Sequence, residues 1–153
     1  MEFATPNNLS DDTLDALDDL IAANIDGAKV LDEAGDQVRT LGDSVELASI
    51  AAVHRAHAQE LQQLQRQNRR RPENDGTFGG KAHKAWTSFR TALNAGNPDV
   101  ALLEARRAEE RVCDAYAEAI KDAGSNPVND VLHRQLRAVK KQRDHLEQER
   151  ENR

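Results

Sequence analysis

The stretch RRRPENDGTFGG, residues 69–80, decides how the helices of this chain are arranged. It contains Pro72, the turn signal Asn74-Asp75-Gly76 and the pair Gly79-Gly80, and it interrupts the helical pattern on either side. The wider interruption, Gln67 to Gly96, combines irregular chain, at up to about 3.5 Å per residue, with one short helix. Because a helix of about 25 residues measures roughly 38 Å, this interruption is long enough to cross a whole bundle.

Two long helices are predicted before the interruption. The first spans residues 11–38 and follows Ser10, a residue type that caps helix N-termini. The second spans residues 43–68, where Asp43 and Glu46 resemble a capping box. The link between them is short, so the two helices should be antiparallel neighbours. The apolar face of the first helix comprises Leu14, Leu17, Ile21, Ile25, Ala28 and Leu31, and that of the second includes Leu47, Ile50, His54, His57, Leu61 and Leu64.

Three helices are predicted after the interruption begins. A short one at residues 81–95 carries Trp86 and, with Phe78 and Phe89, should pack onto the bundle. Long helices are predicted at residues 98–123 and 127–150. Each begins at the proline of an Asn-Pro start signal, and Gly124 suits the C-terminal cap of the first of them. The pattern favours two antiparallel hairpins joined by one long crossover, which lets the second and third long helices run parallel. A simple up-down bundle with an excursion is the alternative.

Composition limits the classes of function. The 153 residues suit one domain, expected at residues 11–151 after a flexible N-terminus at residues 1–10. The net charge of −6 argues against nucleic-acid binding, which needs a basic face. No secretory signal and no apolar run of about 18 residues is present, so we expect a cytoplasmic protein without a membrane span. Cys113 is the only cysteine, which excludes an intrachain disulfide.

Charge is distributed unevenly along the chain. Residues 1–38 contain ten acids and one base, Lys29. We interpret the acidic and basic segments as solvated faces that complement each other within or between subunits. The alternative is a phosphate or lipid site on the last helix. That helix carries a basic cluster formed by Arg134, Arg137, Lys140, Lys141 and Arg143.

Four short motifs give the chain a family likeness. They are Asp26-Gly27, His83-Lys84-Ala85-Trp86, Ala115-Tyr116-Ala117-Glu118-Ala119 and Arg134-Gln135-Leu136. Together with the order of hairpin, Trp-bearing crossover and hairpin, they resemble the bacterial ferritin-like four-helix-bundle proteins of unknown function, which are related to rubrerythrin and bacterioferritin. The likeness covers roughly residues 13–148. It implies a ferritin-like bundle with a long crossover that carries an extra short helix.

The resemblance also implies a metal site, whose ligands are incomplete here. The wider group binds two metal ions through one Glu from each of two helices and a Glu-x-x-His pair from each of the others. Glu109 lies on an apolar stripe and matches such a Glu, whereas Lys29 occupies a position where relatives tend to carry Glu. Helix two offers Val53, and the last helix offers Ala138, Val139 and Gln142, where ligands would be needed. The site is therefore expected to be degenerate.

A buried Glu109 needs a partner, since an unpaired charge in a core is costly. Our hypothesis is that Lys29 supplies it and replaces the charge of the metal. His54 and His57 lie one turn apart and, with Glu60 and with His145 from another helix, could hold zinc or nickel. The more ordinary interpretation is that both histidines are hydrogen-bonded at the edge of the core.

The sequence favours a non-catalytic bundle. It contains no convincing Ser-His-Asp triad, no Gly-rich phosphate loop and no paired cysteines. Cys113 is interpreted as a residue of the packed core. We expect no cofactor, and we expect a homodimer acting through protein contacts or as a stress-associated structural protein. The alternative is an iron-, manganese- or zinc-binding ferritin-like protein that uses Glu109 with His54 or His57. A third interpretation is an anion-binding or membrane-surface module on the basic last helix.

Overall fold

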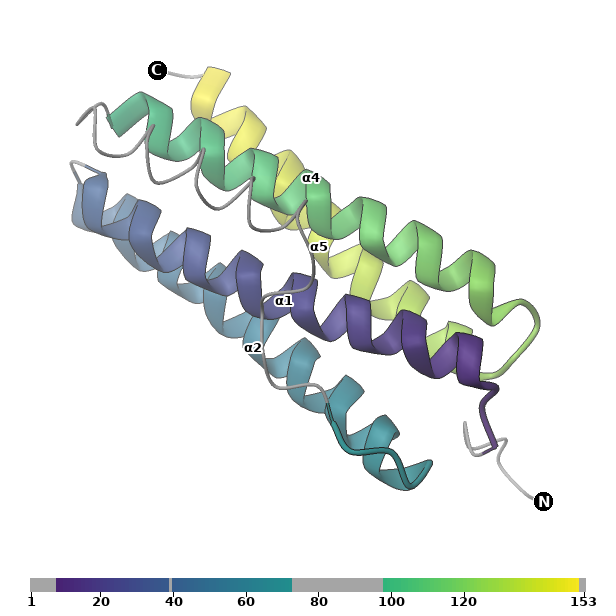
Figure 1. Cartoon of the computed structure of the whole chain (residues 1–153). Helices are drawn as coiled ribbons and strands as arrows, with labels where there is room; N and C mark the ends of the chain where they lie inside the picture. The colour runs from purple at the N-terminus through teal and green to yellow at the C-terminus, as the bar shows by residue number, and fades with distance from the viewer. Residues whose placement is uncertain (1–7, 39, 73–97, 152–153) are drawn as a thin grey trace.

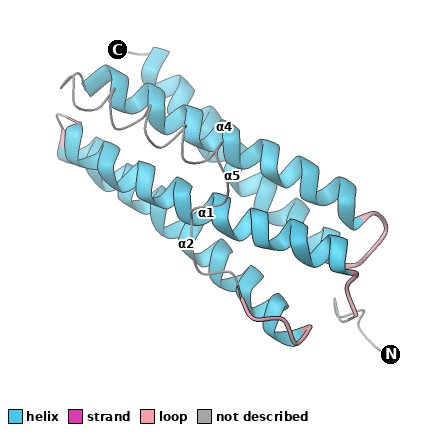
Figure 2. Ribbon diagram, in the orientation of Figure 1, coloured by secondary structure: helices cyan, strands magenta, loops and turns pink. Residues whose placement is uncertain are grey.

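The computed structural model describes residues 8–38, 40–72 and 98–151, which form four long α-helices (Figure 1). They are α1 (Asp11–Gln37), α2 (Leu41–Gln67), α4 (Pro98–Ala123) and α5 (Val128–Glu151). The described residues contain no strand, and the expected all-α four-helix bundle is confirmed (Figure 2). The predicted helix at residues 81–95 and the aromatic residues Phe78, Trp86 and Phe89 lie outside the described residues. None of the described helices is both long and apolar enough to cross a bilayer.

The helices form two antiparallel hairpins. In Figure 1, α1 packs against both α2 and α4 and runs opposite to each, so α2 and α4 point the same way. Helix α5 returns antiparallel to α4, as the ion pairs Arg106–Glu147 and Glu110–Arg143 also require. A parallel α2 and α4 agrees with the crossover expected from the long interruption and not with a simple up-down order.

Side-chain caps define three of the helix starts. Ser10 Oγ accepts a hydrogen bond from Thr13 N at 3.2 Å before α1. Asn126 Oδ1 accepts from Val128 N at 2.9 Å before α5. The prediction of a capping box at Asp43 and Glu46 is wrong. The N-cap of α2 is Thr40, an extended residue whose Oγ1 accepts a hydrogen bond from Asp43 N at 3.0 Å. Helix α2 therefore begins two residues earlier than expected, and Glu46 is released for other contacts.

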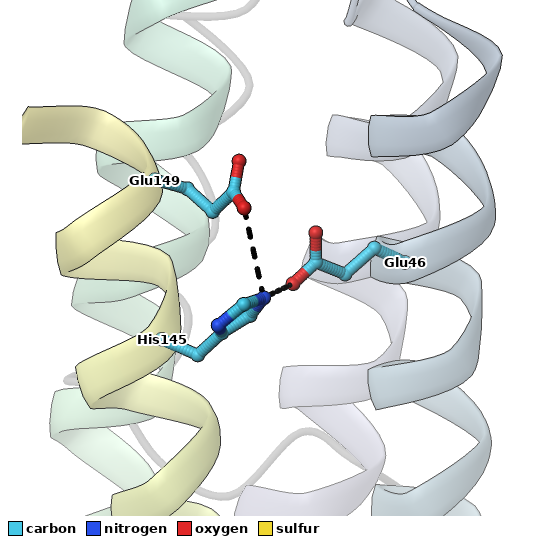
Figure 3. A group of neighbouring side chains, drawn as sticks. All are labelled: Glu46, His145 and Glu149. Atoms are coloured by element: carbon cyan, nitrogen blue, oxygen red, sulfur yellow. Dashed lines mark ion pairs between the residues drawn. The ribbon is translucent and has the colours of Figure 1, made fainter. Parts of the chain in front are cut away.

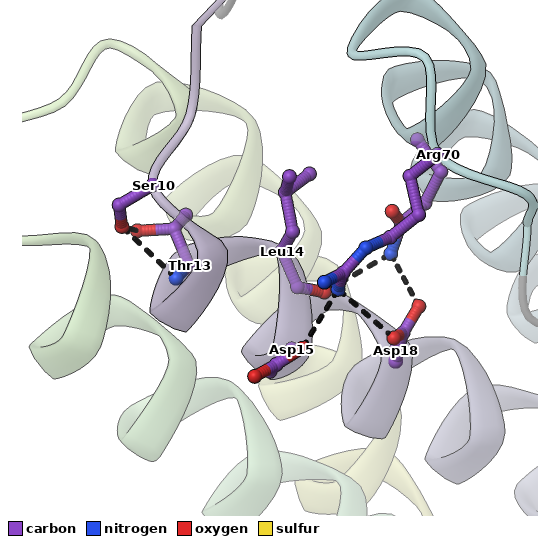
Figure 4. A network of polar contacts seen from close by, with 7 residues as sticks. Ser10, Thr13, Leu14, Asp15, Asp18 and Arg70 are labelled. Atoms are coloured by element: carbon purple, nitrogen blue, oxygen red, sulfur yellow. Dashed lines mark hydrogen bonds and ion pairs between the residues drawn. The ribbon is translucent and has the colours of Figure 1, made fainter.

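The first helix begins against the end of the second. Leu9 is buried, and its backbone N–H donates to Asn68 Oδ1 at 2.9 Å. Figure 4 shows Arg70 directed at Asp15 and Asp18, with Nη1 2.8 and 3.1 Å from their carboxylates. The acidic first turns of α1 are thus paired with the end of α2.

Within the described residues, the core consists of two apolar clusters. One lies where α1 begins and α4 ends, and includes Leu17, Leu61, Tyr116 and Leu132. The other lies towards the opposite end and includes Leu31, Leu47, Leu102 and Leu146. Between the two clusters, three fully buried polar residues follow one another across α1, α2 and α4: Asn24, His54 and Glu109. This polar layer is where the candidate site is centred.

Candidate functional site

His54 joins three helices at the centre of the bundle. Its Nε2 lies 2.6 Å from Glu109 Oε1, and its Nδ1 lies 2.8 Å from Asn24 Oδ1. All three side chains are fully buried. Both nitrogens of the ring therefore have protein partners.

The direction of these hydrogen bonds is fixed by a backbone carbonyl. Asn24 Nδ2 donates to Leu20 O at 3.0 Å, and a carbonyl oxygen can only accept. The amide oxygen of Asn24 consequently faces His54, so Nδ1 of His54 carries the proton that it donates. Nε2 then faces Glu109 Oε1 at 2.6 Å, within hydrogen-bonding distance. The imidazole thus gives the buried Glu109 carboxyl group a hydrogen-bonding partner, which lowers the cost of burying it.

The network continues to the surface through α4 and α5. Asn24 Nδ2 also donates to Tyr116 Oη at 3.1 Å, and Tyr116 Oη donates to Gln135 Oε1 at 2.7 Å. Gln135 Nε2 then donates to Glu60 Oε1 at 2.6 Å. We call this set, namely Asn24, His54, Glu60, Glu109, Tyr116 and Gln135, the buried network.

The surface end of the buried network is an ion pair. Arg134 Nη2 donates to Glu60 Oε2 at 2.5 Å, and both side chains are partly exposed. Burial alone would raise the pKa of Glu60, but hydrogen bonds from Arg134 and Gln135 lower it below its usual value. Glu60 is therefore a carboxylate at neutral pH. The network thus starts at the buried His54–Glu109 pair and ends at the partly exposed Arg134–Glu60 ion pair.

The ring of His57 lies edge-on to that of His54, with ring centroids 6.5 Å apart, but it takes no part in the His54–Glu109 hydrogen bond. The same ring lies against Tyr116, with Nδ1 3.5 Å from Tyr116 Oη and the ring centroids 6.5 Å apart. Burial, followed by nearby His54, lowers the pKa of His57 to about 4. Of the three residues His54, His57 and Glu109, only His54 and Glu109 are joined by a hydrogen bond in the structure.

Lys29 does not form the expected charge pair with Glu109. Its side chain is exposed, whereas Glu109 is fully buried, and the group beside the Glu109 carboxyl is His54. The predicted Lys29–Glu109 charge pair is therefore replaced by a His54–Glu109 pair. A long cation on the outer face of α1 keeps its hydration there, whereas the imidazole of His54 is already in the core.

Gly27 accounts for the close approach of the helices beside this pair. A Cβ atom at Gly27 would lie 3.2 Å from Val112 Cγ2 and 3.8 Å from His54 Nε2. The Asp26-Gly27 motif thus gives α1 room to pack against α2 and α4 at the level of the polar layer.

Cys113 lies near the same layer and has the properties of a core residue. Burial raises the pKa of its thiol to about 11, with Glu109 and Glu110 adding to the effect of burial. The thiol is therefore protonated at neutral pH, while a nucleophilic cysteine needs the thiolate.

His145 lies at the other end of the bundle, away from the buried network. Its Nε2 is 2.5 Å from Glu46 Oε1 on α2 and 3.8 Å from Glu149 Oε1 on its own helix (Figure 3). The ligand atoms of these three residues lie within 4.8 Å of one another. We call Glu46, His145 and Glu149 the end cluster.

Sequence reasoning missed Asn24 and gave Gln135 no role, so it overlooked two of the six residues of the buried network. Asn24 interrupts the apolar stripe of α1, and it is fully buried where we had placed Ile25, which is only half-buried. Gln135 likewise lies beside Leu132 and Leu136 on the inner face of α5. A polar amide within an apolar stripe was the available signal at both positions. Glu46 was missed because it was assigned to a cap.

Comparisons with known proteins give one finding. A family model described as a domain of unknown function (DUF2383) matches residues 12–122, which is more than half of the chain and includes all of the polar layer. The comparison with curated proteins and the comparison with solved structures each gave no match.

Proposed function

We propose, on the premise that the chain belongs to the DUF2383 family, that it is a non-catalytic helical bundle with a structural or protein-interaction role. In this proposal the bundle is related to ferritin-like proteins, and hydrogen-bonded side chains occupy the place of their metal centre.

The observation that carries the proposal is the double pairing of His54. A histidine binds a metal through a ring nitrogen that is free to coordinate. Here Nδ1 donates to Asn24, and Nε2 is in contact with Glu109 at 2.6 Å. A metal ion on Nε2 would have to displace Glu109 from a hydrogen bond in the middle of the core. The buried network thus supports a metal-free interior.

The chemistry of the remaining groups supports a non-catalytic role. A catalytic acid or base has a pKa near the working pH and access to a substrate. Burial instead raises the pKa values of Cys113 and Tyr116, which keeps both groups protonated at neutral pH. Burial lowers the pKa of His57 instead, so its imidazole is neutral at neutral pH.

The surface of α2 supports protein contacts. Leu41 and Val45 are 80% and 60% exposed, and they are one turn apart at the start of the helix. Two large apolar side chains on one exposed face favour burial against a second copy or another protein. A homodimer in the cytoplasm is the form that we propose.

A metal-binding core is the second candidate, and one atom favours it. Glu109 Oε2 is buried and has no hydrogen-bond partner within the described part of the chain. A carboxylate oxygen of this kind is a ligand for iron, manganese or zinc. In this alternative, Glu109 and His54 would be the first ligands, and His57 would have to turn away from Tyr116.

The metal-free bundle and the metal-binding core can be distinguished by the metal content of untagged protein, measured by mass spectrometry. The measurement is made on the wild type and on Glu109→Gln. The proposal predicts no stoichiometric iron or manganese in either protein, and melting temperatures indifferent to both ions. Stoichiometric iron or manganese that is lost in Glu109→Gln, with a melting temperature that the ion raises only in the wild type, would overturn the proposal.

A further inference from the structure

The end cluster places three metal-binding side chains from two helices around one point. Glu46 comes from the second turn of α2, and His145 and Glu149 are one turn apart near the end of α5 (Figure 3). His145 Nε2 lies between the two carboxylates, 2.5 Å from Glu46 Oε1 and 3.8 Å from Glu149 Oε1. One imidazole and two carboxylates, the latter from different helices, form a donor set that suits zinc.

The bonding of Glu46 is incomplete. Its Oε1 atom is buried, yet no hydrogen bond in the described structure is aligned with it, even though His145 Nε2 is close. The contact between the two atoms is nevertheless short, at 2.5 Å, as in an ion pair. A cation bound here would replace the proton of this contact, and the two atoms would move apart until both lone pairs point at the ion.

The local charge also favours a cation. The groups that act on Glu46 are the carboxylates of Glu149 and Asp43 and the imidazole of His145. Acids thus outnumber bases among the groups that act on Glu46. A divalent ion would relieve the repulsion between the carboxylates more fully than a single imidazolium does.

We propose that Glu46, His145 and Glu149 bind one divalent transition-metal ion of the zinc class, which clasps α2 to α5. His145 coordinates through Nε2, each glutamate through one oxygen, and a water molecule takes the fourth position. Ligand atoms around a tetrahedral zinc ion lie about 3.3 Å apart, given bond lengths of about 2.0–2.1 Å. The cluster reaches this spacing by small side-chain rotations, since its ligand atoms already lie within 4.8 Å of one another.

The position of this site gives it a structural effect. Helix α2 belongs to the first hairpin and α5 to the second, so the ion would connect the hairpins at the end of the bundle where α5 terminates. Binding that requires the folded arrangement raises the free energy of unfolding. The site is independent of the buried network and of the proposed metal-free interior.

The competing interpretation is a metal-free ion-pair cluster. In that case a protonated His145 bridges Glu46 and Glu149 and has no affinity for metal beyond that of any exposed histidine. His133, an exposed histidine on the same helix, provides the matched control for this comparison.

The test is calorimetric titration of the chelator-treated, untagged full-length chain with Zn²⁺, repeated with Co²⁺ to record its visible absorption spectrum. We expect one ion per chain, the intense visible bands of tetrahedral Co²⁺, and a melting temperature raised by Zn²⁺. His145→Ala should abolish all three effects. Glu46→Gln and Glu149→Gln should each weaken binding by about tenfold or more.

The controls make a negative result equally clear. His133→Ala should bind as the wild type does, and circular dichroism should show that every variant keeps its helical content. Glu109→Gln should bind zinc as the wild type does. If zinc binding were lost in this variant, the ion would lie in the core, which would contradict both the end-cluster proposal and the proposed metal-free interior. A wild type that does not bind, or binding that survives in His145→Ala, would overturn the end-cluster proposal.

Discussion

The buried network and the end cluster each join a histidine to a glutamate on another helix, but their surroundings differ. The His54–Glu109 pair is fully buried, and Asn24 holds the second nitrogen of the ring. His145 is 53% exposed and lies between two carboxylates. The first histidine has its bonding capacity filled by protein, while the second faces an excess of acceptors. The same pair of residue types thus serves packing in one place and is open to a ligand in the other.

Changing Glu109 should have the largest effect. Glu109→Leu leaves Nε2 of a buried histidine without a partner, and we expect a loss of about 3 kcal/mol or more in the free energy of unfolding. Glu109→Gln can donate its amide N–H to Nε2 and should lose less than half as much. Urea denaturation measures both variants. Equal losses would show that the hydrogen bond is not what stabilises this region.

Removing one hydroxyl should have an intermediate effect. Tyr116→Phe deletes the donor to Gln135 Oε1 and the acceptor for Asn24, while the ring stays in place. A buried acceptor left without a donor costs about 1–3 kcal/mol, so the melting temperature should fall clearly. A loss below about 0.5 kcal/mol would mean that the network does not extend energetically beyond Asn24.

The two buried glycines of α1 should respond differently to alanine. At Gly35 the nearest atom to a new Cβ is 3.7 Å away, so Gly35→Ala should gain up to about 1 kcal/mol from helix propensity. At Gly27 the nearest atom, Val112 Cγ2, is only 3.2 Å away, and this crowding should cancel the gain or reverse it. Paired urea titrations give the difference. A gain at Gly27 as large as at Gly35 would contradict the close packing at the polar layer.

The smallest expected effect is on the pH dependence of stability. Burial lowers the pKa of His57 to about 4 in the folded protein, whereas the unfolded chain has an ordinary value near 6.5. The unfolded state therefore binds a proton first as the pH falls, and stability is lost between about pH 6.5 and 4. His57→Gln should reduce this loss, by less than about 1 kcal/mol because the ring is only partly buried.

The same pH series on His133→Gln is the control, because His133 is exposed on α5. Its profile should follow that of the wild type. If His57→Gln does not flatten the acid limb relative to this control, the environment of His57 is not as apolar as its packing against Tyr116 indicates.

The helices were largely predictable, because caps and apolar periodicity are local signals. Ser10 and Gly124 are examples: the first accepts the hydrogen bond expected of a cap, and the second has the positive φ of a helix terminus. Asp43 shows the limit, since Thr40 is also a good cap and only three-dimensional geometry chooses between them. Periodicity could place Glu109 in the core, but it could not choose between Lys29 and His54 as its partner, because that depends on the relative rotation of three helices.

The directed hydrogen bonds of the buried network also set the axial positions of the helices. One turn of α4 advances about 5.4 Å, so a shift of one turn along the bundle would place Ala105 or Cys113 opposite His54. The energy of apolar contacts would change little with such a shift, because the residues one turn before and after Glu109 are small or apolar. The His54–Glu109 hydrogen bond would be broken by it, since Nε2 would no longer lie opposite Glu109 Oε1. One imidazole thereby determines the height at which α1, α2 and α4 meet.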